Sequence, residues 1–141
     1  MDREEIKSIL LHRDDMLLLD SVEEIDGVAH GLYHVRGDEF FLRGHFPGFP
    51  IVPGVIQCEI MAQSACILLK DKVDGDAMPV YAGLDKVRFH SSVYPGDDFR
   101  TEVRITKSHH PFYFAEGRGY VGDRLCVSGT FSFAITQRKE G

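Results

Sequence analysis

Cysteine is scarce in this sequence, and no long apolar run is present. The three cysteines, Cys58, Cys66 and Cys126, are odd in number and lack CxxC spacing, which argues against a disulfide framework and a cysteine zinc site. We therefore expect reduced cysteines in the core. No apolar stretch reaches the roughly 20 residues that span a bilayer, and the N-terminus is charged from its second residue. We therefore expect no membrane segment and no secretory signal. On this basis the predicted location is the cytoplasm.

Basic residues are also too few for a nucleic-acid-binding surface. The 141 residues include 16 Lys and Arg against 22 Asp and Glu, which gives a formal net charge of -6. A nucleic-acid-binding protein would show a basic surplus, because it gains affinity by displacing counterions from phosphates. The 43% of hydrophobic residues is enough to build a core. We expect one globular domain over residues 1–141.

The spacing of apolar residues predicts an α+β fold. Helical spacing occurs over residues 2–11 and, without Gly or Pro from Val55 to Lys72, over a long helix at 53–72. That helix is apolar on most of its circumference, as expected for an element wrapped by others. Alternating or β-branched stretches, separated by turn dipeptides such as Asp26-Gly27, predict strands at 16–25, 28–35, 79–90, 99–106, 112–121 and 125–135. About six antiparallel strands, with the last four as a meander, should pack against one helix.

Several patterns that suggest chemistry have simpler structural interpretations. The GxGxxG over 117–122 precedes a strand rather than a helix, so these are expected to be hairpin glycines and not a dinucleotide site. The pair His109-His110 is expected in a hydrated turn, because adjacent histidines point apart on a strand. His30 and His34 share one strand face and are interpreted as structural.

His45 lies in a different setting. Three Gly and three Pro between residues 40 and 54 exclude a regular element through that stretch. His45 stands between Gly44 and the run Phe46-Pro47-Gly48, where glycine lets the backbone approach a ligand and proline restricts the loop. The imidazole can therefore be held in place rather than solvated. We interpret His45 as a candidate catalytic base, with a purely structural histidine as the alternative.

Glu59 is the second candidate, because apolar residues surround it on the predicted helix. It lies beyond the first helical turn, in which an acid would simply complement the helix dipole. A carboxylic acid in apolar surroundings resists ionisation and can donate a proton near neutral pH. Gln63 follows one turn later, in position to orient Glu59. The alternative is a carboxyl group that pairs with a partner chain.

The start of the same helix suits a developing negative charge. Gly54 presents a backbone N–H at the positive end of the helix, and Val55 beside it is a candidate substrate-binding position. Glu59 lies about 7.5 Å further along the axis. A carbonyl at Gly54 and a hydroxyl near Glu59 place the carbon between them within reach of a base on the loop. This arrangement predicts removal of a proton α to a carbonyl with loss of a β-hydroxyl.

The same motifs resemble a known family. The segments Gly44-His45-Phe46-Pro47-Gly48, Pro53-Gly54-Val55, Glu59 and Ala62-Gln63 are similar to the signature of FabZ-type 3-hydroxyacyl-acyl-carrier-protein dehydratases of bacterial fatty acid synthesis. The resemblance extends to residues 82–89 and 93–97 and covers nearly the whole chain. It implies a hot-dog fold, in which an antiparallel sheet wraps around the long helix. It also implies acyl carrier protein as the partner and a homodimer with shared active sites, often in a trimer of dimers.

The reaction implied is dehydration of a (3R)-3-hydroxyacyl thioester to the trans-2-enoyl thioester, in fatty acid biosynthesis or a related pathway. Neutral His45 removes the C2 proton, the Gly54 N–H supports the thioester oxygen, and Glu59 protonates the departing C3 hydroxyl. No metal or organic cofactor is expected, since the phosphopantetheine arm belongs to the substrate. Arg88, Arg100 and Arg104 are candidates for binding the acidic carrier.

Three alternatives remain open. The related dehydratase-isomerase is longer and usually has Asp at the position of Glu59. A hot-dog thioesterase would use a helix carboxylate to promote attack of water on the thioester. A non-catalytic acyl-carrier binding module is disfavoured because an unused carboxyl group in an apolar setting costs stability. Leu11 and Asp15 stand where the family commonly has Pro, and Ser91-Ser92 where it has Arg-Pro, which bears on the substrate and carrier surface.

Overall fold

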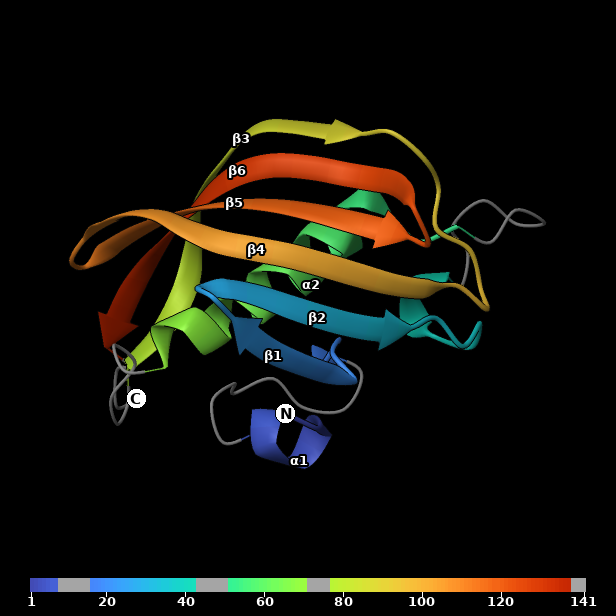
Figure 1. Ribbon diagram of the computed structural model, residues 1–141, viewed down its shortest axis with the longest axis horizontal. Helices are drawn as coiled ribbons and strands as arrows, with labels where there is room; N and C mark the ends of the chain where they lie inside the picture. The colour runs from blue at the N-terminus through green and yellow to red at the C-terminus, as the bar shows by residue number, and fades with distance from the viewer. Residues whose placement is uncertain (8–15, 43–50, 71–76, 138–141) are drawn as a thin grey trace.

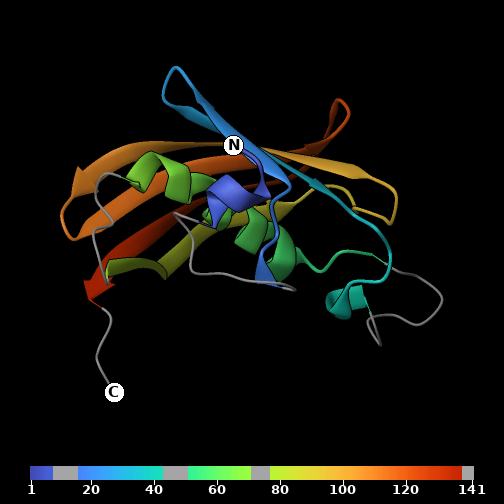
Figure 2. The same ribbon diagram turned by 90° about the horizontal axis from the view of Figure 1, so that it is seen from below.

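Six antiparallel strands bend around one long helix, α2, which lies against one face of the sheet (Figures 1 and 2). The computed structural model describes residues 1–7, 16–42, 51–70 and 77–137. In chain order the elements are α1 (Arg3–Ile6), β1 (Ser21–Ile25), β2 (Val28–His34), η2 (Phe40–Leu42), α2 (Gly54–Cys66), η3 (Ile67–Leu69), β3 (Ala77–Phe89), β4 (Asp98–His109), β5 (Phe112–Val121) and β6 (Arg124–Gln137). The predicted α+β architecture of six strands and one long helix is confirmed.

The strand order is β1-β2-β4-β5-β6-β3, with antiparallel neighbours throughout. The expected four-strand meander is therefore wrong for its first strand, because β3 pairs with β6 at the sheet edge and not with β4. The connection at 90–97 carries the chain past β5 and β6. It is held there because the N–H groups of His90 and Ser91 donate to the Cys126 carbonyl, at 2.7 and 3.3 Å. Spacing along the chain predicts strands but not which of them become neighbours.

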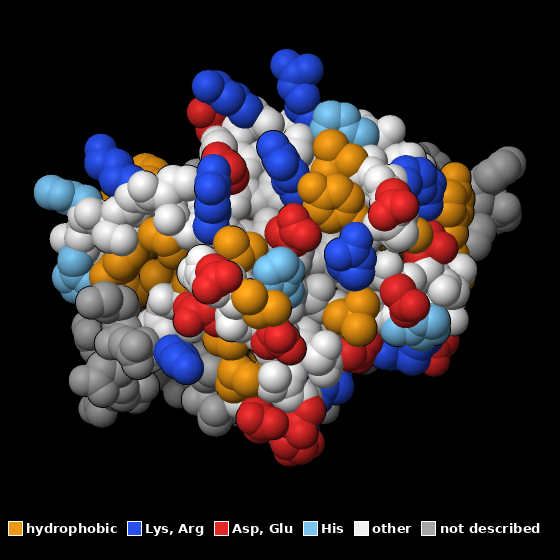
Figure 3. Space-filling view, in the orientation of Figure 1, with side chains coloured by type: hydrophobic (Ala, Val, Ile, Leu, Met, Phe, Trp, Pro, Cys, Tyr) orange, Lys and Arg blue, Asp and Glu red, His pale blue; other side chains and the backbone are white. Residues whose placement is uncertain are grey.

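Strand β4 shows the alternation that the sequence predicts. Phe99, Thr101 and Val103 are buried on the face that α2 covers, and the side chains between them point to the opposite face. On that opposite face, Lys and Arg prevail over β3 and β6 whereas acids prevail over β1 and β2 (Figure 3). One face of the sheet thus builds the core and the other carries the charge.

Helix α2 packs closely on the sheet and is buried through most of its length. Gly31 in β2 permits this approach, because a Cβ there would collide with the side-chain oxygens of Ser64 and Thr101. The α-helix ends at Cys66 and continues as the short η3 helix, within the predicted range of 53–72. No helix in the described ranges is long and apolar enough to cross a membrane.

Leu17, Leu18 and Leu19, which precede β1, are buried but do not form a strand. The prediction began this strand at Met16, whereas β1 begins at Ser21. Gln63 of α2 explains the difference, since its Oε1 accepts from the Leu18 N–H at 2.8 Å and its Nε2 donates to the Met16 carbonyl at 2.7 Å. The backbone here satisfies its hydrogen bonds with a helix side chain in place of a neighbouring strand.

Candidate functional site

The start of α2 is set by Pro53. This residue is the N-cap, and its carbonyl accepts from the N–H groups of Ile56 and Gln57 at 3.0 and 3.2 Å. The first N–H groups of a helix have no partner within it. No described residue accepts from the N–H of Gly54 or Val55. Within the described part of the chain, these two backbone donors at the positive end of α2 have no acceptor, and their position suits an electronegative group.

The aromatic ring of Phe89 covers this helix start. A Cβ built on Gly54 would lie 2.6 Å from Cζ of that ring, so only glycine allows the ring to pack so closely. Phe89 is the last residue of β3 and remains 55% exposed, while Val55 is 73% exposed. An edge strand and the helix start thus form one partly apolar corner.

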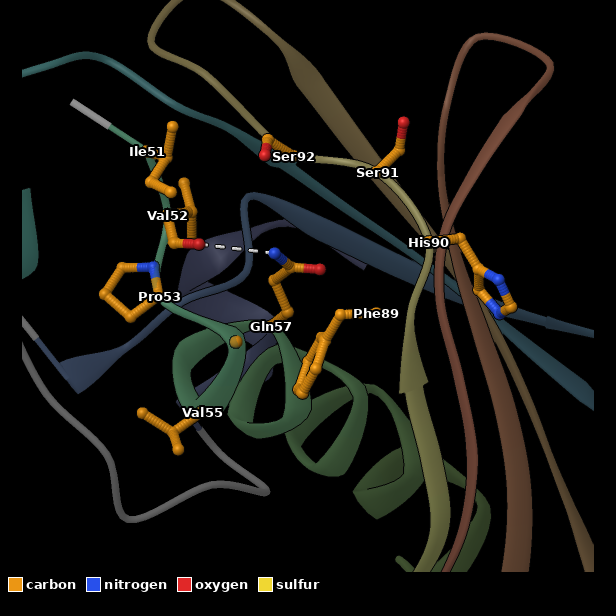
Figure 4. Close-up of a pocket in the computed structure, with 10 residues that line it drawn as sticks. Ile51, Val52, Pro53, Val55, Gln57, Phe89, His90, Ser91 and Ser92 are labelled. Carbon is orange, nitrogen blue, oxygen red and sulfur yellow. Dashed lines mark hydrogen bonds between the residues drawn. The ribbon is translucent and has the colours of Figure 1, made fainter. Parts of the chain in front are cut away.

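A cavity of about 550 Å³ opens at this corner (Figure 4). Its walls come from the extended segment before α2, the first turn of the helix and the chain that leaves β3: Ile51, Val52, Pro53, Gly54, Val55, Gln57, Phe89, His90, Ser91 and Ser92. The cavity contains two predicted site residues, Gly54 and Val55. It also contains Ser91 and Ser92, which the sequence marked as departures from the family pattern.

Gln57 is a cavity residue that the sequence analysis missed. Its side chain is 3% exposed, and Nε2 donates to the Val52 carbonyl at 3.3 Å. Oε1 is buried and has no hydrogen-bond partner among the described residues. The available signal was a carboxamide between Ile56 and Cys58 in an otherwise apolar run.

Glu59 lies on another side of α2. It is partly buried and does not line the cavity. Residues two positions apart are rotated by about 200° around a helix, so Glu59 and Gln57 point to roughly opposite sides of α2. The carboxylate of Glu59 lies close to two buried thiols: burial raises the pKa of Cys66 to about 12, and the negative charge of Glu59 adds to the effect. Burial and then Glu59 also raise the pKa of Cys58.

Tyr81 joins the edge strand to the middle of this helix. Its hydroxyl donates to the Cys58 carbonyl at 2.5 Å. Burial is the main cause that raises the pKa of this phenol, and the neighbouring Cys58 and Glu59 contribute further. The hydroxyl therefore remains protonated and keeps β3 attached to the turn of α2 that carries Glu59.

Gln63, the predicted orienting residue, forms hydrogen bonds through its carboxamide with the main chain of Met16 and Leu18. It is 1% exposed. These contacts give Gln63 a structural role in holding the segment before β1. Its action on Glu59 remains a prediction.

The predicted base His45 lies at 43–50, outside the described residues, as do Leu11 and Asp15. The chain that leads to this segment is held by a buried acid. Glu39 accepts from the Tyr33 hydroxyl at 2.7 Å and from the N–H groups of Arg36 and Gly37 at 2.9 and 2.7 Å. Burial alone would raise the pKa of Glu39, but these hydrogen bonds together hold it below its ordinary value.

The residues of the remaining motifs lie in the core, in strands and in turns. All three cysteines are free and buried. Gly117 and Gly119 lie in β5, and Gly122 forms the turn to β6 with a φ of 58°. His109 and His110 lie at the turn from β4 to β5, where the His110 Nδ1 lies 2.9 Å from the Tyr113 hydroxyl. Among the residues that the structure describes, no three His, Cys, Asp or Glu side chains gather as metal ligands would.

The three predicted carrier-binding arginines differ in their surroundings. Arg104 pairs with Glu116 at 2.7 Å. Arg100 donates to the Gly122 carbonyl at 2.8 Å and lies over the Tyr120 ring. Arg88, which directly precedes Phe89, is exposed and forms no ion pair with a described residue. Its charge is therefore the least compensated of the three.

Comparison with known proteins shows the relatives of this chain. Residues 10–130 match the family described as the FabA-like domain. Proteins named 3-hydroxyacyl-(acyl-carrier-protein) dehydratase FabZ are similar over almost their whole length. The protein from Natranaerobius thermophilus is 39% identical over 97% of this chain and 99% of its own. That from Clostridium perfringens is 42% identical over 96% of this chain and 99% of its own.

Solved structures share the fold at lower identity. A chain of the dehydratase heterocomplex ApeI:P from Xenorhabdus doucetiae superposes with a TM-score of 0.79 at 20% identity, covering 94% of this chain and 91% of that one. The conserved protein PA5202 from Pseudomonas aeruginosa gives a TM-score of 0.70 at 20% identity, covering 92% and 98%. The hot-dog fold that the resemblance implied is thereby confirmed.

Proposed function

Because the chain belongs to the family of FabA-like domains, we propose that it dehydrates 3-hydroxyacyl thioesters of acyl carrier protein to trans-2-enoyl thioesters in fatty acid biosynthesis. The observation that carries this proposal is 36 to 42% identity to FabZ dehydratases over nearly the whole chain. The family resemblance predicted from the sequence motifs is confirmed. Neither a thioesterase nor a non-catalytic carrier-binding module is favoured by these relatives.

The proposed mechanism uses one group from the loop and two from α2. Neutral His45 removes the proton from C2 of the substrate, and the electron pair moves toward the thioester carbonyl. The N–H of Gly54 stabilises the charge that develops on that oxygen, because it lies at the positive end of the helix. Glu59 protonates the C3 hydroxyl, which leaves as water. The available N–H at Gly54 and the partly buried position of Glu59 on the same helix support these roles.

The proposal includes no metal or organic cofactor, since proton transfer alone balances the reaction. Water leaves and a C2–C3 double bond forms, without a change of oxidation state that would require a redox partner. The phosphopantetheine arm arrives as part of the substrate. A cytoplasmic location and a single domain over 1–141 remain predictions.

Product analysis tests the reaction. Incubation with 3-hydroxyacyl carrier protein of several chain lengths should form enoyl carrier protein, detected by a loss of 18 Da as water. Release of free carrier thiol with a 3-hydroxy acid would instead identify a thioesterase. Binding of the carrier without either product would identify a binding module.

We also propose that a second copy completes each site. Exposed apolar side chains gather on β3 and at the start of α2, including Val55, Val80, Leu84 and Phe89. β3 also lies at one end of the strand order. A two-fold partner could cover these residues, and the family resemblance implies that His45 of one chain then meets Glu59 of the other.

Mixing two inactive variants tests the shared site. Refolding His45→Ala together with Glu59→Gln makes roughly half of the dimers mixed, and each mixed dimer has one intact site and one that lacks both groups. Activity should return to about a quarter of the wild-type value. If both residues act within one chain, the mixture will stay inactive despite demonstrated subunit exchange.

A further inference from the structure

The carboxamide oxygen of Gln57 is a buried acceptor for which the described residues offer no donor. Gln57 is 3% exposed, and its Nε2 is bound to the Val52 carbonyl at 3.3 Å. This bond orients the amide, so Oε1 points away from Val52 and toward the side of the cavity that Phe89 and His90 line (Figure 4). No described residue donates to it. Because buried polar groups are nearly always partnered, this oxygen suits a ligand that carries a hydrogen-bond donor.

The cavity around Gln57 also specifies the rest of that ligand. The N–H groups of Gly54 and Val55 have no described acceptor and suit a carbonyl oxygen. Pro53 and the exposed ring of Phe89 offer apolar walls. A matching ligand has a carbonyl group and an N–H that are joined by an apolar linker. A thioester of pantetheine has this order, because its first amide lies two methylene groups beyond the sulfur.

The two sides of α2 separate the two halves of such a thioester. Gln57 and Glu59 point to roughly opposite sides of the helix, and Gly54 lies at its start between them. With the thioester carbonyl at Gly54, the acyl chain extends toward Glu59. The thiol arm then extends into the cavity, toward Gln57.

We infer that Gln57 recognises the first amide of the pantetheine arm, with Oε1 accepting the amide N–H. This inference rests on the proposed function, which makes the substrate a pantetheine thioester. Gln57 is then a substrate-positioning residue that takes no part in proton transfer. It discriminates thiol arms with an N–H at that position from arms without one.

A pair of small substrates isolates this hydrogen bond. One is the 3-hydroxyacyl thioester of N-acetylcysteamine, which retains the first amide. The other is the 2-acetoxyethyl thioester of the same acid, in which an ester oxygen replaces the amide N–H. Wild-type protein should prefer the amide by about 10-fold in kcat/KM. The ester has no N–H to donate to Oε1, and it places its own oxygen, which is also an acceptor, next to Oε1.

Gln57→Met should bring the ratio of the two kcat/KM values to about 1. Both substrates are measured on each protein, so general effects of the substitution on packing cancel in the ratio. A wild-type ratio near 1 would overturn the inference and leave water or a second copy as the partner of Oε1. A preference that persists in Gln57→Met would overturn it as well, since another group would then recognise the amide.

A second measurement uses wild-type protein alone and serves if Gln57→Met does not fold. The side-chain N–H resonances of Gln57 should shift when S-butyl N-acetylcysteamine is added, but not with its ester analogue. A shift with both compounds, or with neither, contradicts the inference. The proposed function fails separately, if wild-type protein dehydrates neither these thioesters nor 3-hydroxyacyl carrier protein.

Discussion

Helix α2 carries two buried glutamines whose surroundings differ sharply. Gln63 is 1% exposed, and both ends of its carboxamide are bound to the main chain, at 2.7 and 2.8 Å. Gln57 is 3% exposed, with only Nε2 bound at 3.3 Å and Oε1 without a described partner. Near the end of α2, the described residues bond to both the oxygen and the nitrogen of the Gln63 carboxamide. Near its start, beside the cavity, they leave the Gln57 carboxamide oxygen without a donor.

The polar groups near each glutamine differ in the same way in their hydrogen bonding. Toward the C-terminal end, the Ser64 hydroxyl donates to the Ile60 carbonyl at 2.9 Å and lies 2.6 Å from the Thr101 hydroxyl. At the start of the helix, the N–H groups of Gly54 and Val55 have no described acceptor. Polar groups in the second half of α2 bond to the rest of the fold, whereas the first half carries the groups that we propose bind the substrate.

The largest expected effect concerns the proposed chemistry. Glu59→Gln and His45→Ala should each lower kcat by roughly 10² to 10⁴, because each removes a positioned acid or base. Formation of the enoyl product measures the rate, and the unfolding curve checks the fold. Glu24→Gln, an exposed acid on β1, is the matched control and should retain full activity. Near-normal turnover in Glu59→Gln or His45→Ala would remove that residue from the mechanism.

The next largest effect should be a difference between the two glutamines in their contribution to the stability of the protein. Gln63→Met leaves the buried Leu18 N–H and the partly buried Met16 carbonyl without their partner, so we expect a loss of about 2 to 4 kcal/mol in the free energy of unfolding. Gln57→Met gives up one long hydrogen bond but also removes an unpartnered acceptor, so its change should stay within about 1 kcal/mol. Urea unfolding measures both. Equal losses would contradict the division of α2 into two halves.

Packing at the helix start should produce a moderate effect. Gly54→Ala places a methyl group 2.6 Å from the Phe89 ring and should displace it, lowering kcat/KM by about 10-fold through misplaced substrate. Adding Phe89→Leu makes room and should restore part of the loss. If the double variant is no better than Gly54→Ala alone, the collision is not the cause.

Carrier binding should respond more weakly. Arg88→Ala should raise KM for the carrier substrate about 3-fold, whereas Arg104→Ala should change it by less than about 2-fold because Glu116 already compensates that charge. The difference should disappear at high ionic strength. An equal effect of both variants would argue against Arg88 as the docking residue.

The smallest effect appears only in acid. The pKa of Glu39 is held below its ordinary value of 4.5, so its hydrogen bonds stabilise the protein above that pH and this contribution is lost as the pH falls through the lowered pKa. Wild-type stability should therefore decline more steeply below about pH 4.5 than that of Glu39→Gln. Urea unfolding from pH 7 to pH 3 measures this difference. Parallel curves would show that Glu39 does not couple to protons in this range.

Local patterns predicted the individual elements well. The alternation of β4, the turn glycine at 122 and the apolar helix after Pro53 each depend on neighbours within a few residues. The pairing of β3 with β6 and the late start of β1 could not be found in this way. They depend on a crossing connection and on the side chain of Gln63, which meet their partners only in the folded chain.

The same distinction between local and long-range information applies to the candidate site. The sequence by itself identified the family and predicted the chemistry, since His45, Gly54 and Glu59 are residue types able to transfer protons and stabilise an oxyanion at a suitable spacing. Only the tertiary structure decided that Phe89 closes over Gly54, that Gln63 holds the segment before β1, and that Gln57 lies beside a cavity with an oxygen to which no described residue donates. Spacing along one helix is short-range geometry that a sequence encodes directly. Whether a buried polar atom is satisfied depends on groups far away along the chain, which come close to it only when the sheet bends around α2.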